Sequence, residues 1–534
     1  MCGILSLLNV SNLNKLIIKN FEKGKNRGPE NSNIECFFKS IVMGFHRLAI
    51  NGLNEKDNQP LNISNCVLIC NGEIYNYNYL YSQINIDRFS ENDCEIIIHL
   101  YKKFGIEETL NLLDGVFAFV LLDIEKKLLF VARDAFGVRP LFTFKKQKHY
   151  GFSSEMKMIV DFEPENISLF TPGTFSKFKY EENLWKPELT NVKFANINNG
   201  IDYTIETEKD AMKKIKLALE NAVKKRVGAT ERPIACLLSG GLDSSLITSL
   251  VQKYYTSELE TYSIGLEGSE DLKYAKIVAD YLNTKHTEII VTEKEFLEAI
   301  PKTIEAIESY DTTTVRASVG NFLVSEYIKK NSKAKVIFNG DGSDEVCGGY
   351  LYFHAAPNAF DFDKECRRLL KDIHAFDVLR SDRSISSNGL EPRTPFLDRN
   401  FVQTYLSIPA HLRCHNIEKK CEKYLLRSAF KDSKLLPDNI LFRKKEAFSD
   451  GVSDLKRSWY QIIQEHIKTN RRIQQTIKTP FISLWNIQSL TDEQKYYRKI
   501  FEHYYKEYSN VIPYFWMPKF IKATDASART LDLY

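Results

Sequence analysis

Cys2 directly follows Met1 and precedes a glycine, and this position is chemically informative. A small second residue usually permits removal of the initiator methionine, which would leave Cys2 with both a thiol and a free α-amine. Reference pKa values are about 8.5 for the thiol and about 7.7–8.0 for the amine, so the amine can take the thiol proton at neutral pH. The sequence therefore predicts a nucleophilic cysteine that needs no histidine as its base.

A second stretch whose residues could take part in chemistry is SGGLDSS at 239–245. It lies between the predicted strand PIACLL (233–238) and the predicted helix SSLITSLVQKYY (244–255). Backbone N–H groups at the start of a helix attract anions, the two glycines permit a tight turn, and the serine hydroxyls add donors. No GK[ST] is present, so this is not a Walker loop. Asp243 beside phosphates would require a cation, which indicates Mg²⁺. A plain strand-to-helix turn is the alternative; the context favours phosphate binding.

The elements before residue 160 are short and apolar. VFAFVLLDIEKKLLFVARD (116–134) predicts a β-hairpin, with two runs of β-branched and aromatic residues separated by IEKK. Both faces of the first run are apolar, so that strand should be covered on both sides. A layered sandwich is therefore expected.

The pattern changes after a polar, Asn-rich stretch at 162–205, which is interpreted as late strands and a linker. A helical segment at 208–227 is followed by strand, helix, strand (LETYSIGL, 259–266) and helix (KYAKIVADYL, 273–282). This alternation is typical of a parallel α/β sheet. We expect two domains, at 2–205 and 206–534.

The composition excludes several classes of protein. The chain has 534 residues and a formal net charge of +4, with scattered basic residues, so nucleic acid is not an expected partner. Its ten cysteines include no CxxC pair, and CHNIEKKC at 414–421 is interpreted as chance rather than a metal cluster. No apolar run reaches the roughly 18 residues of a membrane span, and no secretory signal is recognised. A cytoplasmic protein without a membrane partner is expected.

Further motifs resemble known families. One set resembles the glutaminase domain of class II amidotransferases: MCGI, RGPE (27–30), HRLAI (46–50), NGEIYN (71–76), NDCE (92–95) and RDAFGVRPLF (133–142). The other set resembles the glutamine-hydrolysing asparagine synthetase family: SGGLDSS, YDTTTVRAS (310–318), NGDGSDEVCGGYLYFHAAPN (339–358), LRSDRS (379–384), GLEPRTPFLD (389–398), RKKEAFSDGV (443–452) and the tail VIPYFWMPKF…ATDASARTLDLY.

The resemblance covers nearly the whole chain and implies a two-domain fold. An N-terminal-nucleophile αββα sandwich (α+β) would precede a parallel α/β sheet of the ATP-pyrophosphatase, adenine nucleotide α-hydrolase-like type, with extra helices. The reaction that it implies forms β-aspartyl-AMP from L-aspartate and ATP, and ammonia from L-glutamine then displaces AMP. The products would be asparagine, glutamate, AMP and pyrophosphate. A homodimer is left open.

The implied glutaminase site uses Cys2 as nucleophile, with the Asn71 side chain and the Gly72 N–H as oxyanion donors. Arg47 would pair with the α-carboxylate of glutamine, while Glu73 and Asp93 would accept from its α-ammonium. Taken singly, these residues have plainer explanations, namely a surface ion pair for Arg47, a turn at NGE and a helix cap at Asp93. The full set expected to bind glutamine is Arg47, Leu48, Ala49, Ile50, Asn51, Asn71, Gly72, Glu73 and Asp93.

The implied synthetase site binds ATP and Mg²⁺. Asp243 and Asp344 would hold the metal, Lys445 would stabilise the departing pyrophosphate, and Asp341 is also expected to be catalytic. Thr313 and Arg316 are the candidates for binding aspartate; singly, Lys445 and Thr313 could be a solvated lysine and a hydrogen-bonded helix residue. The residues expected to contact ATP are Leu238, Ser239, Gly240, Gly241, Asp243, Ser244, Ser245, Ile264, Asn339 and Gly340.

Three positions depart from the family pattern. Asp341 stands where the family has glutamate (SGEGSDE against NGDGSDE), so its carboxylate is one methylene shorter. A displacement of about 1 Å can cost on the order of a hundredfold in rate, which predicts slower synthetase chemistry or a compensating backbone shift. Asn339 replaces a serine and should alter one adenosine contact. Pro392 removes one N–H whose use the sequence does not reveal.

Two other functions stay open. The chain could be a related amidotransferase or β-lactam-type synthetase with another carboxylate substrate, although Cys2, Arg47 and NGE argue against the lactam-forming type. It could also be a non-catalytic regulatory descendant, which only Asp341, Asn339 and Pro392 favour. An enzyme of the implied kind needs a route that keeps ammonia unprotonated, and the interface between the sandwich and the α/β sheet is the expected place.

Overall fold

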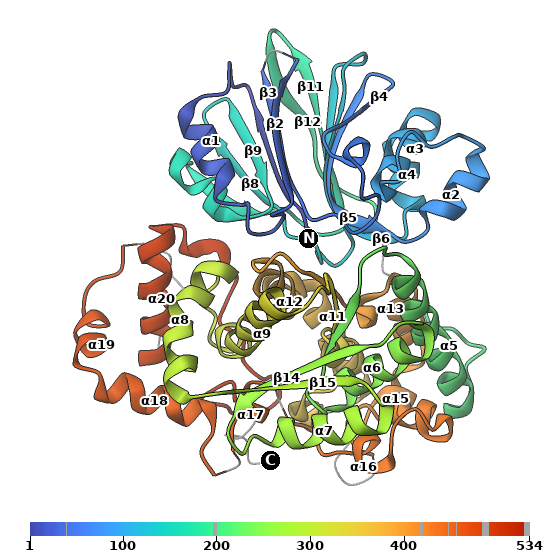
Figure 1. Cartoon of the computed structure of the whole chain (residues 1–534), viewed down its shortest axis with the longest axis vertical. Coiled ribbons are helices and arrows are strands. Elements are labelled where there is room, and N and C mark those ends of the chain that lie inside the picture. Colours follow the sequence, from blue (N-terminus) through green and yellow to red (C-terminus); the bar gives the residue numbers. More distant parts are fainter. Residues whose placement is uncertain are drawn as a thin grey trace.

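Two antiparallel sheets face each other in the N-terminal half of the chain (Figure 1). The computed structural model describes residues 1–38, 40–195, 200–415, 420–446, 448–454, 456–482 and 491–527. The first sheet has the order β10-β8-β9-β1-β3-β2 and the second β12-β11-β7-β6-β5-β4. The strands are β1 (Gly3–Leu8), β2 (Asn31–Phe37), β3 (Ile41–Arg47), β4 (Leu61–Ile63), β5 (Cys66–Ile74), β6 (Gly115–Asp123), β7 (Leu128–Arg133), β8 (Phe142–Lys146), β9 (His149–Ser153), β10 (Asn166–Leu169), β11 (Thr174–Glu181) and β12 (Leu184–Lys193).

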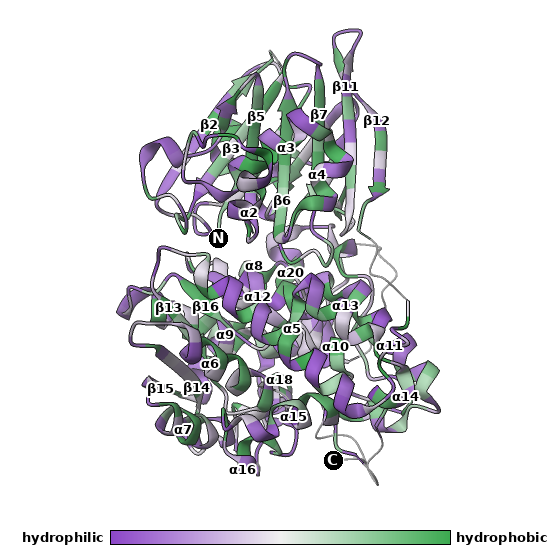
Figure 2. Cartoon of the chain, turned by 90° about the vertical axis from the view of Figure 1, so that its right-hand side faces the viewer, coloured by the Kyte–Doolittle hydropathy of each residue, from purple (hydrophilic) through white to green (hydrophobic). Residues whose placement is uncertain are grey.

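The predicted hairpin is confirmed, because β6 pairs antiparallel with β7. Both faces of β6 are buried, as expected: Val120 packs between the sheets with Ile4 of β1, and Phe119 packs on the outer face. That outer face is covered by α2 (Tyr77–Ile84), α3 (Ile96–Phe104) and α4 (Ile106–Leu112), and α1 (Lys15–Glu22) covers the other sheet. Figure 2 shows hydrophobic residues concentrated on β5 and β6, whereas the edge strand β12 is mixed and mostly exposed. The sandwich is therefore αββα, as expected.

The C-terminal half is built on a five-stranded parallel sheet with the order β15-β14-β13-β16-β17, which confirms the predicted α/β class. Alternate residues of its strands face opposite layers of helices; Cys236 packs with α6 and Ala235 with α9. The strands are β13 (Ile234–Leu237), β14 (Glu260–Leu266), β15 (Lys285–Val291), β16 (Val336–Phe338) and β17 (Glu391–Arg393).

The helices of this half surround the sheet and extend beyond it. The predicted helices at 208–227, 244–255 and 273–282 are present as α5, α6 and α7. The helices are α5 (Glu208–Gly228), α6 (Leu242–Tyr254), α7 (Glu270–Leu282), α8 (Glu293–Ile307), α9 (Thr312–Asn331), α10 (Ser343–Cys347), α11 (Ala359–Asp372), α12 (Asp377–Ser386), α13 (Arg399–Ser407), α14 (Ala410–Arg413), α15 (Tyr424–Phe430), α16 (Asp438–Leu441), α17 (Phe448–Gly451), α18 (Trp459–Thr469), α19 (Arg471–Thr476) and α20 (Asp492–Tyr505). Among the described residues, none of these helices is long and apolar enough to cross a membrane.

After β13 the chain forms β14, which pairs with one side of β13, and later β16, which pairs with the other side of β13. A parallel sheet opens a crevice at the carboxyl ends of its strands where the strand order reverses. The segment that follows β13 contains SGGLDSS, and the segment that follows β16 contains NGDGSDE. Topology therefore brings the two motifs together.

The two halves meet over a buried, charged interface, and the N-terminus lies between them (Figure 1). Arg27 of the sandwich pairs with Asp382 of α12 at 2.8 Å, and both side chains are buried. Arg139 lies 3.7 Å from Glu391 of β17. The Asn-rich stretch forms β10, β11 and β12, as expected for late strands, while 196–199 of the predicted linker lie outside the described residues. Residues 416–419 of the motif at 414–421 and the tail after 527 also lie outside them.

Pro392 is accommodated because β17 is an edge strand. The backbone groups of Glu391 and Arg393 point toward β16: Glu391 N donates to Lys335 O at 2.7 Å, and Arg393 O accepts from Asn339 N at 3.2 Å. Pro392 therefore faces away from the ladder, where its carbonyl accepts from Arg139 Nη1 at 3.4 Å. Proline is tolerated at such a position because no ladder hydrogen bond is lost.

Candidate active sites

Cys2 lies at the start of β1, at the end of the sandwich that faces the α/β half. Its thiol donates to Leu48 O, just after β3, at 3.6 Å, and its carbonyl accepts from Arg27 Nε at 3.0 Å. Burial raises the pKa of the thiol and lowers the pKa of the Met1 α-amine to about 6. Burial therefore disfavours both the thiolate and the ammonium that a proton transfer would form, and the neutral thiol and neutral amine are the resting forms at this place.

Asn71 and Gly72 lie on β5, in the sheet opposite Cys2, and β5 contacts both β1 and β3. Asn71 is completely buried, and neither Oδ1 nor Nδ2 has a hydrogen-bond partner within the described part of the chain. Such unpaired buried atoms are costly and call for an explanation, and binding a ligand is one. A Cβ on Gly72 would lie 2.6 Å from Val116 O and 2.8 Å from Phe117 Cα, so only glycine permits this close pairing with β6. Both features suit the predicted oxyanion donors.

Arg47 ends β3, and its guanidinium is held by the loop that follows. Nη1 donates to Asn54 O at 3.0 Å and to Asn58 Oδ1 at 2.7 Å, and Nη2 donates to Gly52 O. The side chain is buried, so it is not a surface ion pair. The loop fixes where the guanidinium can meet a carboxylate.

Glu73 and Asp93 are both buried near the end of β5. Glu73 accepts from Asn51 Nδ2 at 2.8 Å and lies 3.3 Å from Arg393 of the other half. Asp93 accepts from Ile74 N at 2.6 Å; it is not a helix cap, because Asn92 caps that turn. Burial raises the pKa of Glu73 well above its ordinary value and that of Asp93 to about 6. Two buried carboxyl groups without a full counter-charge suit a cationic ligand.

In the segment 48–50, backbone groups rather than side chains are available to the predicted glutamine site. The side chains of Leu48 and Ile50 pack into the core of the α/β half, so only their backbone can meet glutamine. Ala49 N donates to Glu30 Oε2 at 2.8 Å, and the other oxygen of Glu30 accepts from Arg232 of the other half at 2.8 Å. Glu30, which the sequence reasoning missed as a site residue, belongs to the quoted RGPE motif.

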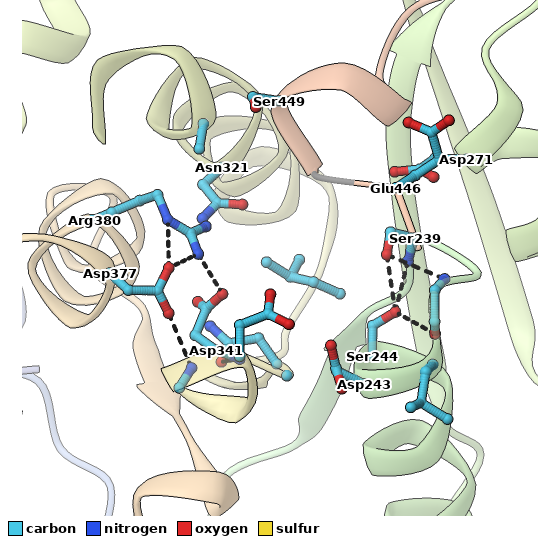
Figure 3. A pocket seen from close by; sticks show the side chains of 18 of the residues that line it. Ser239, Asp243, Ser244, Asp271, Asn321, Asp341, Asp377, Arg380, Glu446 and Ser449 are labelled. Carbon is cyan, nitrogen blue, oxygen red and sulfur yellow. Dashed lines mark hydrogen bonds and ion pairs between the residues drawn. The ribbon is translucent and has the colours of Figure 1, made fainter. Parts of the chain in front are cut away.

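The second site is a cavity of about 200 Å³ at the carboxyl ends of β13, β14 and β16 (Figure 3). It gathers most of the residues predicted for the synthetase site. Those that line it are Leu238, Ser239, Gly241, Asp243, Ser244, Ile264, Thr313, Asn339, Gly340, Asp341, Asp344 and Lys445.

Three predicted residues do not line this cavity. Gly240 has a φ of +70°, and a Cβ there would lie 2.4 Å from the backbone of Tyr274 and Ala275, so it makes the turn against α7. Ser245 is buried inside α6. Arg316 lies one turn along α9 from Thr313 and points into another part of the fold.

Arg316 is engaged by two carboxylates outside the cavity. Its Nε donates to Glu493 Oε1 at 2.9 Å, and its Nη1 donates to Asp525 Oδ1 at 2.7 Å. The side chain is buried and lies over the ring of Tyr460. The structure thus does not bring Arg316 to this cavity; this arginine ties the C-terminal segment to α9, whereas Thr313 lines the cavity and stays a candidate for binding aspartate.

The phosphate-loop prediction agrees with the local geometry. Ser239 N donates to Ser244 Oγ at 3.2 Å, and the two serine hydroxyls lie 3.0 Å apart, which closes the loop on the first turn of α6. A Cβ on Gly340 would lie 2.7 Å from Asp243 Cβ, so glycine lets the two motifs touch. The N-terminus of a 13-residue helix therefore faces the cavity.

Asp243 and Asp344 face a common point. Lys423 Nζ lies 2.5 Å from Asp243 Oδ2 and 2.5 Å from Asp344 Oδ1, and Lys445 Nζ lies 2.6 Å from Asp344 Oδ2. Burial alone would raise the pKa of Asp344, but the two ammonium groups hold it well below its usual range. Two hard carboxylate oxygens this close suit Mg²⁺ together with phosphate oxygens. The two carboxylates therefore fit the implied metal by their chemistry, while Lys423 Nζ occupies the place between them in this structure.

Asp341 is held by Arg380. Its Oδ1 accepts from Arg380 Nη2 at 2.7 Å. Burial raises the pKa of Asp341 to about 6. Asp377 supports the same loop by accepting from Gly342 N at 2.9 Å, and it also binds Arg380 (Figure 3). Sequence reasoning did not select Asp377; Arg380 lies in the quoted LRSDRS motif.

Asn339 stabilises this loop with its side chain. Nδ2 donates to Ser381 Oγ at 2.6 Å, and Oδ1 accepts from Asp341 N at 3.3 Å. Arg443, also missed from the sequence, contacts the other loop: Nη1 donates to Ser239 O at 3.4 Å and Nη2 pairs with Asp271 at 3.0 Å. The contact of Asn339 with Asp341 N and the contact of Arg443 with Ser239 O both position main chain that faces the cavity.

Comparisons with known proteins agree with this arrangement. The family profile described as "Asparagine synthase" matches residues 214–361 and 356–510, and that described as "Glutamine amidotransferase domain" matches residues 1–207. "Asparagine synthetase (glutamine-hydrolyzing)" from Gallus gallus is 40% identical over 575 aligned positions, covering 100% of this chain and 99% of the relative. The protein of the same name from Homo sapiens is 39% identical over 573 positions, with the same coverage.

A solved structure of glutamine phosphoribosylpyrophosphate amidotransferase from B. subtilis covers 55% of this chain and 91% of its own, at 15% identity and a TM-score of 0.33. That likeness is weak, whereas the full-length identities are high. On those identities and both profiles, the chain belongs to the glutamine-hydrolysing asparagine synthetase family.

Proposed function

We propose that the protein converts L-aspartate, L-glutamine and ATP to L-asparagine, L-glutamate, AMP and pyrophosphate. The observation that carries this proposal is the cavity at the carboxyl ends of β13, β14 and β16, where a phosphate loop, two facing carboxylates and Lys445 meet. The sandwich adds a second site around Cys2. The domains would be 2–205 for glutamine hydrolysis and 206–534 for amidation. A homodimer stays a prediction.

In the first site, the Cys2 thiolate would attack the side-chain amide carbon of glutamine after its own α-amine has taken the thiol proton. This step requires that Met1 is absent from the working enzyme. The oxyanion of the tetrahedral intermediate would accept hydrogen bonds from Asn71 Nδ2 and Gly72 N–H. The unpaired, buried amide of Asn71 supports that role. Collapse of the intermediate releases ammonia and leaves a thioester, which water hydrolyses to glutamate.

In the second site, the SGGLDSS loop and the start of α6 would hold the phosphates of ATP. The β-carboxylate of aspartate attacks the α-phosphorus and pyrophosphate leaves, which forms β-aspartyl-AMP. Lys445 is placed to stabilise the negative charge that grows on the leaving group. Mg²⁺, held by Asp243 and Asp344, would neutralise phosphate charge when bound. Thr313 lines the cavity as a candidate for orienting aspartate.

Ammonia must pass from the first site to the second. Free ammonia in water at neutral pH is mostly ammonium, which has no lone pair for attack on the adenylate. We propose that it passes along the buried interface between the halves, where Arg393 contacts Glu73 on one side and Glu391 on the other. Release of ammonia to the solvent in step with glutamine loss, at no cost to asparagine yield, would contradict this route.

The direct test supplies glutamine, aspartate and MgATP together and measures asparagine, AMP and pyrophosphate, with intact mass showing whether Met1 is absent. Equal amounts of the three products are expected. ATP cleavage that ignores aspartate and responds to another carboxylate would favour the related synthetase. No turnover of either substrate would favour the regulatory descendant.

Asp341→Glu is expected to raise asparagine turnover by about tenfold, because misplacement of a catalytic group by about 1 Å is costly. Arg380 donates a hydrogen bond to only one oxygen of Asp341. The longer glutamate side chain would carry the carboxylate further into the cavity. Steady-state kinetics with saturating ammonia in place of glutamine isolate this step. Asp432→Glu, an exposed aspartate, is the matched control. An unchanged or lower turnover would show that the shorter side chain is no handicap.

Glutamine hydrolysis is expected to weaken as pH falls through about 6, since burial raises the pKa of Asp93 to about 6 and the protonated acid no longer attracts the substrate ammonium. The base amine of Cys2 also protonates on acidification, so kcat/KM for glutamine should fall with a slope approaching two protons. In Asp93→Asn the slope should drop to one proton, and kcat/KM itself should be lower than in the unmodified protein. Identical slopes in the two enzymes would remove Asp93 from the ammonium site.

A further inference from the structure

Lys423 is a buried lysine that the sequence motifs do not single out. It directly precedes α15, and its side chain is 1% exposed. Its φ of 57° lies in the left-handed region, which residues with a Cβ rarely adopt. Such backbone strain persists only where the surrounding structure enforces it, and it concentrates at functional sites. The conformation sets the direction in which this side chain leaves the backbone.

Gly349 makes room for the lysine. A Cβ added to Gly349 would lie 1.9 Å from Lys423 Cε and 2.2 Å from Asp344 Oδ1. Any larger residue at 349 would thus obstruct the lysine stem where it approaches the carboxylate. The left-handed backbone at 423 and the glycine at 349 together determine where the ammonium group of Lys423 lies.

That ammonium group bridges two elements of the cavity. Its Nζ lies 2.5 Å from Asp243 Oδ2 on α6 and 2.5 Å from Asp344 Oδ1 on α10. Without a cation between them, the two carboxylates would repel each other. Mg²⁺ binds oxygen at about 2.0–2.1 Å, so a metal ion held by the same two oxygens would need the place that the ammonium takes. In this geometry Lys423 and the metal exclude each other.

We infer that Lys423 is an internal competitor of the divalent cation at Asp243 and Asp344. It keeps the two carboxylates paired until ATP arrives, and the negative triphosphate then offers the ammonium another anion and frees the oxygens for Mg²⁺. Metal and nucleotide consequently bind with positive coupling, and by linkage each promotes the other. The identity of the nucleotide rests on the proposed function, but the competition for the two oxygens does not.

Lys423→Met tests this competition with Mn²⁺, a cation that prefers the same oxygen ligands. Free Mn²⁺ is measured by electron paramagnetic resonance in the absence of nucleotide. We expect the variant to bind Mn²⁺ at least about tenfold more tightly than the unmodified protein, because two carboxylates lose their internal cation. Mn²⁺ should also raise the melting temperature of the variant more than that of the unmodified protein. Lys420→Met, whose lysine pairs with Glu208, is the control and should change neither quantity.

Lys423→Gln provides a second variant, in case the apolar replacement prevents folding. It removes the charge, keeps an amide donor, and should change Mn²⁺ binding in the same direction. Unchanged or weaker Mn²⁺ binding in the folded variants would overturn the inference. The measurement needs no asparagine synthesis, so a failure of the proposed function would appear in the product assay and leave this result standing.

Discussion

Cys2→Ala is expected to lower glutamine hydrolysis by about a thousandfold or more, because the only proposed covalent nucleophile of the first site is lost. Asparagine formation driven by glutamine should fall in parallel. Asparagine formation from added ammonium salts should persist, since the cavity of the second site is built by other elements. Glutamate release and asparagine formation, each measured with glutamine and with ammonium, separate these effects.

The matched control for this change is Cys36→Ala. Cys36 is an exposed thiol on the same sheet and should tolerate replacement without loss of either activity. Cys2→Ser separates the thiol from its position, because a hydroxyl of similar size is a far poorer nucleophile at neutral pH. Glutamine hydrolysis that survived both Cys2 changes would remove Cys2 from the mechanism and, with it, the assignment of Asn71 and Gly72 as oxyanion donors.

Lys445→Met is expected to lower asparagine formation, from either nitrogen source, by about a thousandfold, because a positive group beside a transferring phosphoryl can supply that much. Its ammonium lies 2.6 Å from Asp344, on the wall of the cavity. Glutamine hydrolysis measured without ATP should continue, since no atom of the first site contacts Lys445 among the described residues. Pyrophosphate release reports the affected step directly.

Lys456→Met is the control for the lysine change, because Lys456 is exposed and does not line the cavity. The melting temperature of each variant shows whether a loss of rate reflects a loss of folded protein. Full pyrophosphate release by Lys445→Met would require another cation to stabilise the leaving group. Lys423 and Arg443, which also line the cavity, are the next candidates.

Several site predictions needed only local sequence. The predicted phosphate loop at 239–245 lies between a strand and a helix, as expected, because the apolar run and the helical spacing that flank it are properties of neighbouring residues. Gly72 and Gly340 were predicted only as contacts of the bound substrates. That their lack of a Cβ also lets β6 approach Gly72 and Asp243 approach Gly340 became known only with the fold.

Other residues show where local reasoning ended. Arg316 was expected to bind aspartate, yet its guanidinium pairs with Glu493 and Asp525, the latter 209 residues away along the chain. Pro392 removes one N–H whose use the sequence did not reveal, and its position on an edge strand shows that no ladder hydrogen bond is lost. No sequence motif indicated Lys423, because the position of its ammonium group depends on the left-handed backbone at 423 and on the space that Gly349 leaves.

The sequence by itself determined the class of each half and the chemistry of its motifs, because hydrophobic periodicity and the reactivity of a cysteine or a glycine-rich loop are local properties. The tertiary structure alone decided which side chains share a cavity, which cation pairs with each carboxylate, and which arginine is already neutralised. Those outcomes depend on pairs of residues that are hundreds of positions apart, and electrostatic energies in a buried site are set by such distances.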